Sequence, residues 1–325
     1  MGDYDCCVVL EFQCFSSLAH VTPSSYTNAI ARAAQQSNAS LLVLVKLQDR
    51  QSSPWYSGQQ QDEREDGVAG SLSAPGPQRI TPVQAWTTLE RFLAHAYSAA
   101  TRVFLARQRL TSRVDVVLDD LRGGIPFCIP RGATVERIQL QDKMTGHVDD
   151  AARAQLGSYE VTALGGTFDH LHAGHKILLT MAASVTTRKL ICGVTDEALL
   201  GKKEYKEYLE SVPERINKTR QFLELVRPTC QHDVVAIQDP YGPTAYEPDI
   251  QALVVSEETR AGGEAVNKKR REQSLNELDT LVIELVADDA KTDGGVSAAS
   301  KLGSTGIRRW LHEQEESKTH MTRAA

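Results

Sequence analysis

The sequence lacks the segments that would place a protein in a membrane or on nucleic acid. Its apolar runs are short, whereas a transmembrane helix needs about 20 consecutive apolar residues. The N-terminus has neither the charged start nor the apolar stretch of a signal peptide. The formal net charge is −6, which disfavours the basic face that nucleic-acid binding requires. We therefore expect a cytoplasmic protein with neither a membrane nor a nucleic acid as partner.

The sequence also lacks the spacings that hold a metal. It contains no C-x-x-C pair and no H-E-x-x-H motif, and a P-loop of the form G-x-x-x-x-G-K-[ST] is absent. We predict no metal centre and expect the cysteines to be buried free thiols in a reducing compartment. The six cysteines are Cys6, Cys7, Cys14, Cys128, Cys192 and Cys230.

Composition divides the chain at about residue 150. Residues 1–150 predict an α/β extension whose strands and helices are expected at Cys6–Phe12, Tyr26–Gln36, Ser40–Leu47, 82–98 and Arg113–Leu118. Residues 50–80 are rich in Gln, Ser, Gly, Pro and acidic residues, so we expect this insert to be disordered. Residues 141–155 are polar and predict a linker.

Residues 151–325 alternate apolar strands with helices. The strand-like runs are Val161–Leu164, Leu190–Val194, Val234–Ile237, Leu253–Val255 and Leu281–Val286. The clearest helix is Glu214–Val226, which Ser211 is placed to cap. This alternation predicts a doubly wound, parallel, five-stranded α/β sheet of the Rossmann-like type. We expect residues 150–325 to fold independently, with a loop at 288–300, a last helix from Thr305 to about Glu316 and a polar C-terminal tail.

A glycine-rich turn, GGTFDHLHAGH, joins the first of these strands to a helix. A helix N-terminus offers free N–H groups and a partial positive charge, which favour an anion. His172 and His175 are three residues apart, so both imidazoles face the same side of the first turn. Three glycines let a ligand approach the backbone closely: Gly165, Gly166 and Gly174. The turn therefore predicts a phosphate site.

The histidine pair is open to three other interpretations. Two isolated histidines are more often core residues or part of a solvated helix start, and a pair can ligate zinc. No third ligand lies nearby at a usual spacing. The preceding strand and glycine turn favour the phosphate site over all three.

Taken with further motifs, the turn resembles a known family. It is similar to the T-x-G-H/H-x-G-H signature of the nucleotidyltransferase superfamily. In detail it resembles the eukaryotic-type phosphopantetheine adenylyltransferases, including that domain of the bifunctional coenzyme A synthase. The runs DPYGPT at Asp239–Thr244 and VVSEET at Val254–Thr259 are also similar to that family. The resemblance covers about residues 158–315 and does not extend to residues 1–150.

The resemblance implies an adenylyltransferase of coenzyme A biosynthesis. Such an enzyme transfers AMP from ATP, with Mg²⁺ bound to the nucleotide, to 4′-phosphopantetheine and releases pyrophosphate. Other enzymes of the pathway are possible partners, and no kinase is expected because the P-loop is absent. Two alternatives stay open. One is a cytidylyltransferase, whose usual C-terminal signature R-T-x-G-I-S-T-[ST] is not matched here. The other is a non-catalytic scaffold that binds nucleotides.

The resemblance also implies residue roles. It assigns catalysis to His172, His175 and Lys203. It assigns nucleotide and phosphate binding to Gly165, Gly166, Thr167, Phe168, Gly174, Lys202, Glu258, Arg260, Ser304, Thr305 and Arg308. Ser304 and Thr305 are also placed to cap the last helix while presenting hydroxyl and N–H groups to phosphates. Arg308 follows one turn later on the same face.

Overall fold

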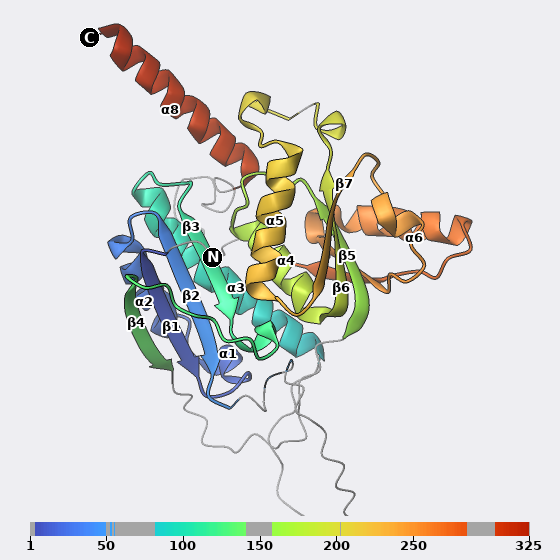
Figure 1. Ribbon diagram of the computed structural model, residues 1–325, viewed down its shortest axis with the longest axis horizontal. Coiled ribbons are helices and arrows are strands. Elements are labelled where there is room, and N and C mark those ends of the chain that lie inside the picture. Colours follow the sequence, from blue (N-terminus) through green and yellow to red (C-terminus); the bar gives the residue numbers. More distant parts are fainter. Residues whose placement is uncertain are drawn as a thin grey trace, which may run out of the picture.

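The computed structural model describes residues 4–49, 53, 55, 82–140, 158–201, 203–284 and 303–324, and it contains two parallel sheets (Figure 1). The predicted linker at 141–155 and the predicted loop at 288–300 lie outside the described residues. So does the insert at 50–80, apart from Ser53 and Trp55. The Trp55 ring packs edge-on against Phe15 at 5.6 Å between centroids.

The N-terminal half is built on a four-stranded sheet in the order β3-β2-β1-β4, with every pair of neighbours parallel. Its strands are β1 Cys6–Phe12, β2 Ser40–Leu47, β3 Arg113–Leu118 and β4 Thr134–Leu140. The first three confirm the predicted strands. β4 was not predicted, because most of its side chains are exposed or half-buried and form no apolar run.

Helices cover one face of this sheet. They are α1 Ser17–His20, α2 Ser24–Gln36 and α3 Pro82–Ala106. Because β1, β2 and β3 follow one another in a single direction, right-handed crossovers place α2 and α3 on the same face. These two helices pack on each other. α3 extends beyond the predicted 82–98 helix, and α2 confirms the predicted helix with an earlier start.

The C-terminal half contains the predicted five-stranded parallel sheet, in the order β7-β6-β5-β8-β9. Its strands are β5 Tyr159–Gly166, β6 Thr186–Thr195, β7 Gln231–Ile237, β8 Ala252–Ser256 and β9 Asp279–Ile283. The strand order reverses between β5 and β8. Open parallel sheets bind ligands at such a reversal, beyond the carboxyl ends of the strands.

α4 Ala173–Val185 and α5 Val212–Val226 lie on one face of this sheet and α6 Arg260–Glu272 lies on the other. The chain continues to α8 Ser304–Ala324. The short 3₁₀ helices here are η3 Glu197–Leu199, η4 Lys206–Tyr208, η5 Gly242–Ala245 and η6 Glu257–Thr259, whereas η2 Asp120–Arg122 follows β3 in the N-terminal half. The Ser211 hydroxyl accepts a hydrogen bond from the Glu214 N–H, which confirms the predicted cap of α5. α8 projects away from the body (Figure 1).

A shared core joins the two halves. One cluster of buried apolar side chains runs from the N-terminal strands through α3 to α4 and α5, and α3 packs directly on α4. The Trp55 indole N–H donates to Ser184 O at 2.9 Å, and the Trp86 indole N–H donates to Val282 O at 3.3 Å. Burial of this kind removes apolar surface from water in both halves at once.

The cysteine prediction holds for five of the six thiols. Five are buried and all six are free, but Cys128 is exposed, so that prediction is wrong for it. Cys128 lies in the irregular segment between η2 and β4 and outside any strand, so no sheet covers it. Among the described helices none is long and apolar enough to cross a membrane.

Candidate active site at the first turn of α4

The turn between β5 and α4 is held in an uncommon backbone conformation. Phe168 and His170 both adopt positive φ, at 50° and 45°. The Phe168 ring is fully buried, and a Cβ on Gly166 would come within 3.1 Å of it. A Cβ on Gly174 would likewise lie 3.2 Å from the His172 ring. These two glycines therefore leave room for the aromatic rings that shape the turn.

The N–H groups at the start of α4 have no partner inside the helix. His172 occupies the N-cap position with extended backbone, and its side chain makes no capping bond. The first helical bond runs from the Lys176 N–H to His172 O at 3.0 Å. The preceding N–H groups of the first turn have no intrahelical partner, as at any helix start, and favour an anion.

The two histidines lie against each other at this helix start. Their ring centroids are 3.9 Å apart with an interplanar angle of 30°, and the Phe168 ring lies 5.3 Å from His175. Both residues are half-buried, and Nδ1 of His175 is buried without a hydrogen-bond partner among the described residues. Desolvation lowers the pKa of His172 to about 4 and that of His175 well below its usual value. Both imidazoles are therefore neutral at pH 7.

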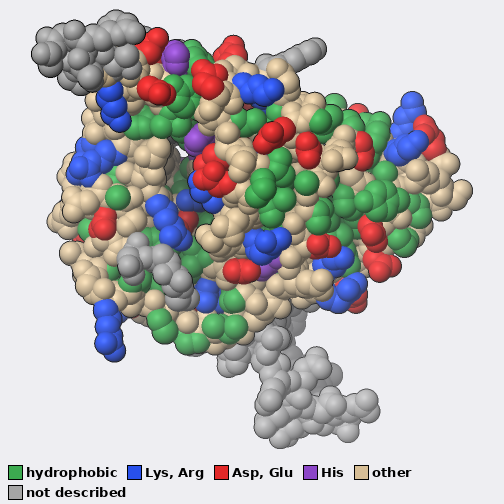
Figure 2. Space-filling model, turned by 45° about the horizontal axis from the view of Figure 1, so that its top comes forward, with side chains coloured by type: hydrophobic (Ala, Val, Ile, Leu, Met, Phe, Trp, Pro, Cys, Tyr) green, Lys and Arg blue, Asp and Glu red, His purple; other side chains and the backbone are tan. Residues whose placement is uncertain are grey.

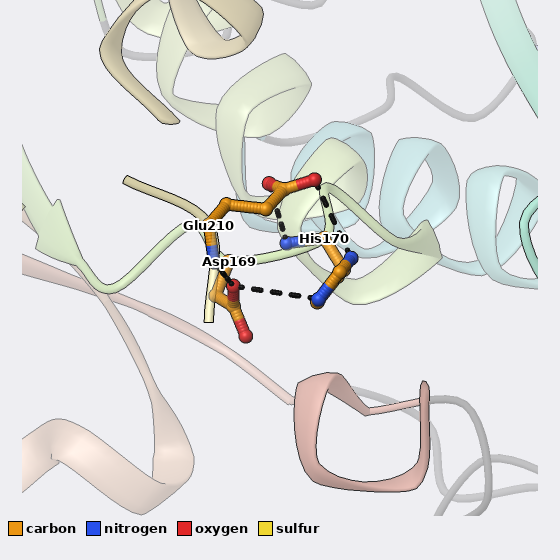
Figure 3. Close-up of side chains that lie close together, drawn as sticks. All are labelled: Asp169, His170 and Glu210. Atoms are coloured by element: carbon orange, nitrogen blue, oxygen red, sulfur yellow. Dashed lines mark hydrogen bonds and ion pairs between the residues drawn. The ribbon is translucent and has the colours of Figure 1, made fainter. Parts of the chain in front are cut away.

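A compact cluster of polar side chains contacts the turn and stabilises it. Asp169, His170 and Glu210 lie together in Figure 3. The Glu210 N–H donates to Asp169 Oδ1 at 3.0 Å, and the His170 N–H donates to Glu210 Oε2 at 2.9 Å. The His170 Nε2–H donates to Tyr208 O at 2.7 Å. These bonds fix the loop that precedes α5 against the turn.

The same cluster is a poor metal site despite its ligand types. Asp169 is already ion-paired with Arg308, and Glu210 lies 2.5 Å from the Lys218 ammonium. His170 donates its Nε2–H to Tyr208 O, which leaves Nδ1 as its one ligand atom. A divalent cation here would meet two neighbouring cations, so the cluster functions as a structural support.

The start of α8 is attached to this turn. The Ser304 hydroxyl donates to Asp169 O at 2.8 Å. The Arg308 guanidinium is 1% exposed, pairs with the Asp169 carboxylate, and donates to Glu204 O at 2.9 Å and to Thr305 Oγ1 at 3.1 Å. Arg308 therefore has protein partners in this structure, and its predicted phosphate contact stays a prediction.

A further buried arginine, Arg215, was not found from the sequence. It is 0% exposed and donates to Thr167 O at 2.8 Å, to Thr195 O at 2.8 Å and to Glu210 O at 2.9 Å. It thereby ties together the carboxyl ends of β5 and β6. An arginine in the first turn of a surface helix gives no sequence signal of this role, because such residues usually point into solvent.

Three of the remaining predicted residues, Lys203, Glu258 and Arg260, are exposed. Lys203 is exposed, and its charge is among those that lower the pKa of His175, after desolvation and the neighbouring histidines. Lys202 lies outside the described residues.

The motif after β8 contributes two predicted residues. Glu258 is exposed in η6. Arg260 pairs with Glu257 at 2.6 Å and is 49% exposed, so in this structure its guanidinium is engaged by a neighbouring carboxylate. Its phosphate contact stays a prediction.

Two cavities flank these elements. One of about 430 Å³ lies between the two halves, beside the turn. In the space-filling view the surface is hollowed, with charged and histidine side chains around the hollow (Figure 2). The other, of about 420 Å³, lies between β7 and η5 and includes part of the DPYGPT run.

Comparison with known proteins identifies the class to which this fold and site belong. Residues 163–299 match the family model described as cytidylyltransferase-like. A phosphopantetheine adenylyltransferase of Saccharomyces cerevisiae is 40% identical over 178 residues, which are 55% of this chain and 56% of the relative. An uncharacterized protein of Schizosaccharomyces pombe is 40% identical over 151 residues, 46% of this chain and 48% of the relative. The chain thus spans about half the length of these two fungal relatives.

A shorter relative is covered almost completely. A phosphopantetheine adenylyltransferase of Pyrobaculum aerophilum is 36% identical over 155 residues, which are 48% of this chain and 93% of that protein. The chain therefore belongs to the phosphopantetheine adenylyltransferase family, within the cytidylyltransferase-like nucleotidyltransferases. The predicted family and the predicted fold class are both confirmed.

Proposed function

We propose that this protein transfers the adenylyl group of ATP to 4′-phosphopantetheine, giving dephospho-coenzyme A and pyrophosphate. The observation that carries the proposal is the pair of stacked imidazoles at the free N-terminus of α4, beside the β5/β8 reversal. Membership of the family supports the choice of substrates. The cytosol as location, and other coenzyme A enzymes as partners, are part of the same proposal.

The reaction needs alignment more than acid–base chemistry. A phosphate oxygen of the acceptor attacks the α-phosphorus of ATP, a P–O bond forms, and the bond to the leaving pyrophosphate breaks. The phosphate monoester is already an anion, so no general base is needed. The protein must bring two anions together and stabilise the charge that grows on the α-phosphate and on the leaving group.

Neutral imidazoles fit this task. A neutral ring carries one N–H, so His172 and His175 can each donate one hydrogen bond to a phosphate oxygen. Their low pKa values keep this state constant across neutral pH. The Lys203 ammonium and the N–H groups of the α4 start add positive potential, and Thr167 is proposed to orient the acceptor phosphate.

Magnesium is proposed to enter bound to the triphosphate. The buried carboxylates next to the turn, Asp169 and Glu210, are neutralised by Arg308 and Lys218. They therefore do not form a carboxylate cage for the ion. Mg²⁺ would instead be held by phosphate oxygens, as is usual for this cation, which keeps several waters and few protein ligands.

Pyrophosphate release with a panel of nucleotides and acceptors tests the proposal. We expect turnover with ATP and 4′-phosphopantetheine, and formation of dephospho-coenzyme A in the same sample. Equal or faster turnover with CTP and phosphocholine would instead support a cytidylyltransferase. Binding of ATP without turnover on any acceptor would support the scaffold. The melting temperature measured with ATP and with CTP separates nucleotide binding from catalysis.

A further inference from the structure

A buried ion pair connects the N-terminal half to the first turn of α4. The Lys176 ammonium lies 2.8 Å from Asp115 Oδ1 and donates to Val114 O at 2.7 Å. The two side chains are 10% and 1% exposed. Lys176 also closes the turn that begins at His172, because its N–H donates to His172 O. One residue thus belongs both to the histidine turn and to the contact with β3.

Asp115 is itself held firmly in the N-terminal half. The Tyr4 hydroxyl donates to Asp115 Oδ2 at 2.6 Å, and the Arg113 Nε–H donates to the same oxygen at 2.5 Å. Arg113 also donates to the Tyr4 oxygen at 2.9 Å. Burial alone would raise the pKa of Asp115, but the charges of Lys176 and Arg113 outweigh it and lower that pKa. The carboxylate is therefore ionised and fixed in position.

The two halves are not tightly packed beside this ion pair. The cavity of about 430 Å³ borders it, lined on one side by α3 residues such as Tyr97 and Phe104 and on the other by His172 and Phe222. Because a cavity provides no opposing atoms, it does not fix the distance between its walls. The direct contact of Lys176 with β3 bridges this gap next to the histidines.

Interface stability alone is a weak explanation for such a pair. A buried ion pair contributes little net stability, since desolvation offsets most of the attraction, but it imposes a defined geometry. The Trp55–Ser184 hydrogen bond joins the halves at the opposite end of α4, far along the helix from the histidines. The ion pair lies at the histidine end of α4, so it can influence the geometry of the turn, whereas the Trp55 contact only joins the two halves.

We infer that Asp115 and Lys176 are positioning residues through which the N-terminal half holds the His172–His175 turn in its reactive geometry. The inference rests on the proposed adenylyl transfer. It gives the N-terminal half a task that the family resemblance does not provide. The Pyrobaculum aerophilum relative is 93% covered by 155 residues of this chain, which leaves no room for a counterpart of both sheets. The ion pair between Asp115 and Lys176 would therefore be a feature of longer family members that have an N-terminal half like this one.

Lys176→Met in the full chain is the primary test. Asp115 keeps Tyr4 and Arg113 as partners when the ammonium is gone, so no buried charge is left alone. We expect kcat per folded molecule to fall about 10- to 100-fold, the scale expected for a small displacement of a reacting group, while KM for ATP stays within about threefold. Trp55→Phe is the matched control, because it removes a contact between the halves at the other end of α4, and it should keep kcat.

Two further measurements complete the test. The double variant Asp115→Asn with Lys176→Met should lose no more activity than Lys176→Met alone, because the two residues act as one unit. Amide hydrogen exchange of residues 176–179, the first hydrogen-bonded amides of α4, should be faster in Lys176→Met and unchanged in Trp55→Phe. That readout requires no turnover, so it stays informative if the proposed reaction fails. Wild-type kcat in Lys176→Met, an equal loss in Trp55→Phe, or unchanged exchange at 176–179 would each overturn the inference.

Discussion

At the scale of single residues, the charge state of the turn histidines determines how they act on a phosphate. An imidazolium would bind ATP strongly before reaction, whereas a neutral ring donates one hydrogen bond that strengthens as charge develops. Desolvation places both rings in the neutral state at pH 7. The pair is thus better suited to stabilising a transition state than to holding the ground state.

Replacing His175 with Ala tests this assignment. We expect kcat to fall about 10²–10³-fold, the usual cost of losing one donor to a developing oxyanion, with a much smaller change in ATP affinity. The turnover per folded molecule and the melting temperature should be measured on the same preparation. A lower melting temperature with near-normal turnover would show that His175 has a structural role.

A second residue-scale prediction concerns Glu90 on α3. Its side chain is 5% exposed, and Oε1 has no hydrogen-bond partner among the described residues. Desolvation, followed by the charge of Glu284, raises its pKa to about 7. A folded-state pKa above the unfolded value of 4.5 gives stability that is present below pH 4.5 and lost as the pH rises through about 7. Lowering the pH through this range therefore increases the contribution of Glu90 to the free energy of unfolding.

Glu90→Gln should accordingly stabilise the protein at pH 8, where the wild-type carboxylate is charged and buried. We expect a gain of about 1–3 kcal/mol that disappears toward pH 5. Urea unfolding at both pH values measures it. The same change at the exposed Glu224 controls for loss of a surface charge. A gain at Glu90 that is equal at pH 8 and pH 5 would contradict the buried-charge explanation.

At the scale of elements, α8 depends on a contact that its own sequence does not reveal. Arg308 reaches Asp169, which lies 139 positions earlier in the chain. Changing Arg308 to Leu leaves a fully buried carboxylate without its cation, so we expect a loss of about 3–5 kcal/mol in unfolding free energy. The neighbouring Arg309 is exposed, and Arg309→Leu should cost less than about 0.5 kcal/mol. Equal effects in the two variants would refute the buried pairing.

The elements themselves were mostly predictable because their patterns are local. Strands such as β1 and β2 are continuous apolar runs, and the Ser211 cap of α5 follows from a short sequence signature. β4 was missed because most of its side chains face solvent and its placement depends on pairing with β1. Sheet pairing between distant segments is set by packing, which a single sequence does not display.

The candidate site divides in the same way. The histidine turn and its glycines were found because one continuous segment contains them. Asp169, Glu210 and Arg215 were not assigned, since their roles arise only when the loops after β5 and β6 and the start of α5 come together. The local motif also predicts a phosphate contact for Arg260, which the structure pairs with Glu257 at the surface, so that contact stays a prediction.

At the scale of the whole molecule, the contacts between the halves bear on whether each half is stable alone. The sequence predicted that residues 150–325 fold independently. In the structure α4 and α5 share a core with α3, and the Lys176 ammonium has its buried partners in the other half. Separation would expose apolar surface and remove the carboxylate next to Lys176, and both changes lower stability.

We therefore expect residues 150–325 alone to melt at a lower temperature than the full chain and to have reduced kcat. Addition of residues 1–140 as a separate polypeptide should raise both toward the full-chain values, because binding to the folded state stabilises it in proportion to partner concentration. Calorimetry and pyrophosphate release at increasing fragment concentration measure the two effects. A fragment 150–325 with the full-chain melting temperature and kcat would show that the N-terminal half contributes to neither. In that case the ion pair between Asp115 and Lys176 would be a contact of docking alone.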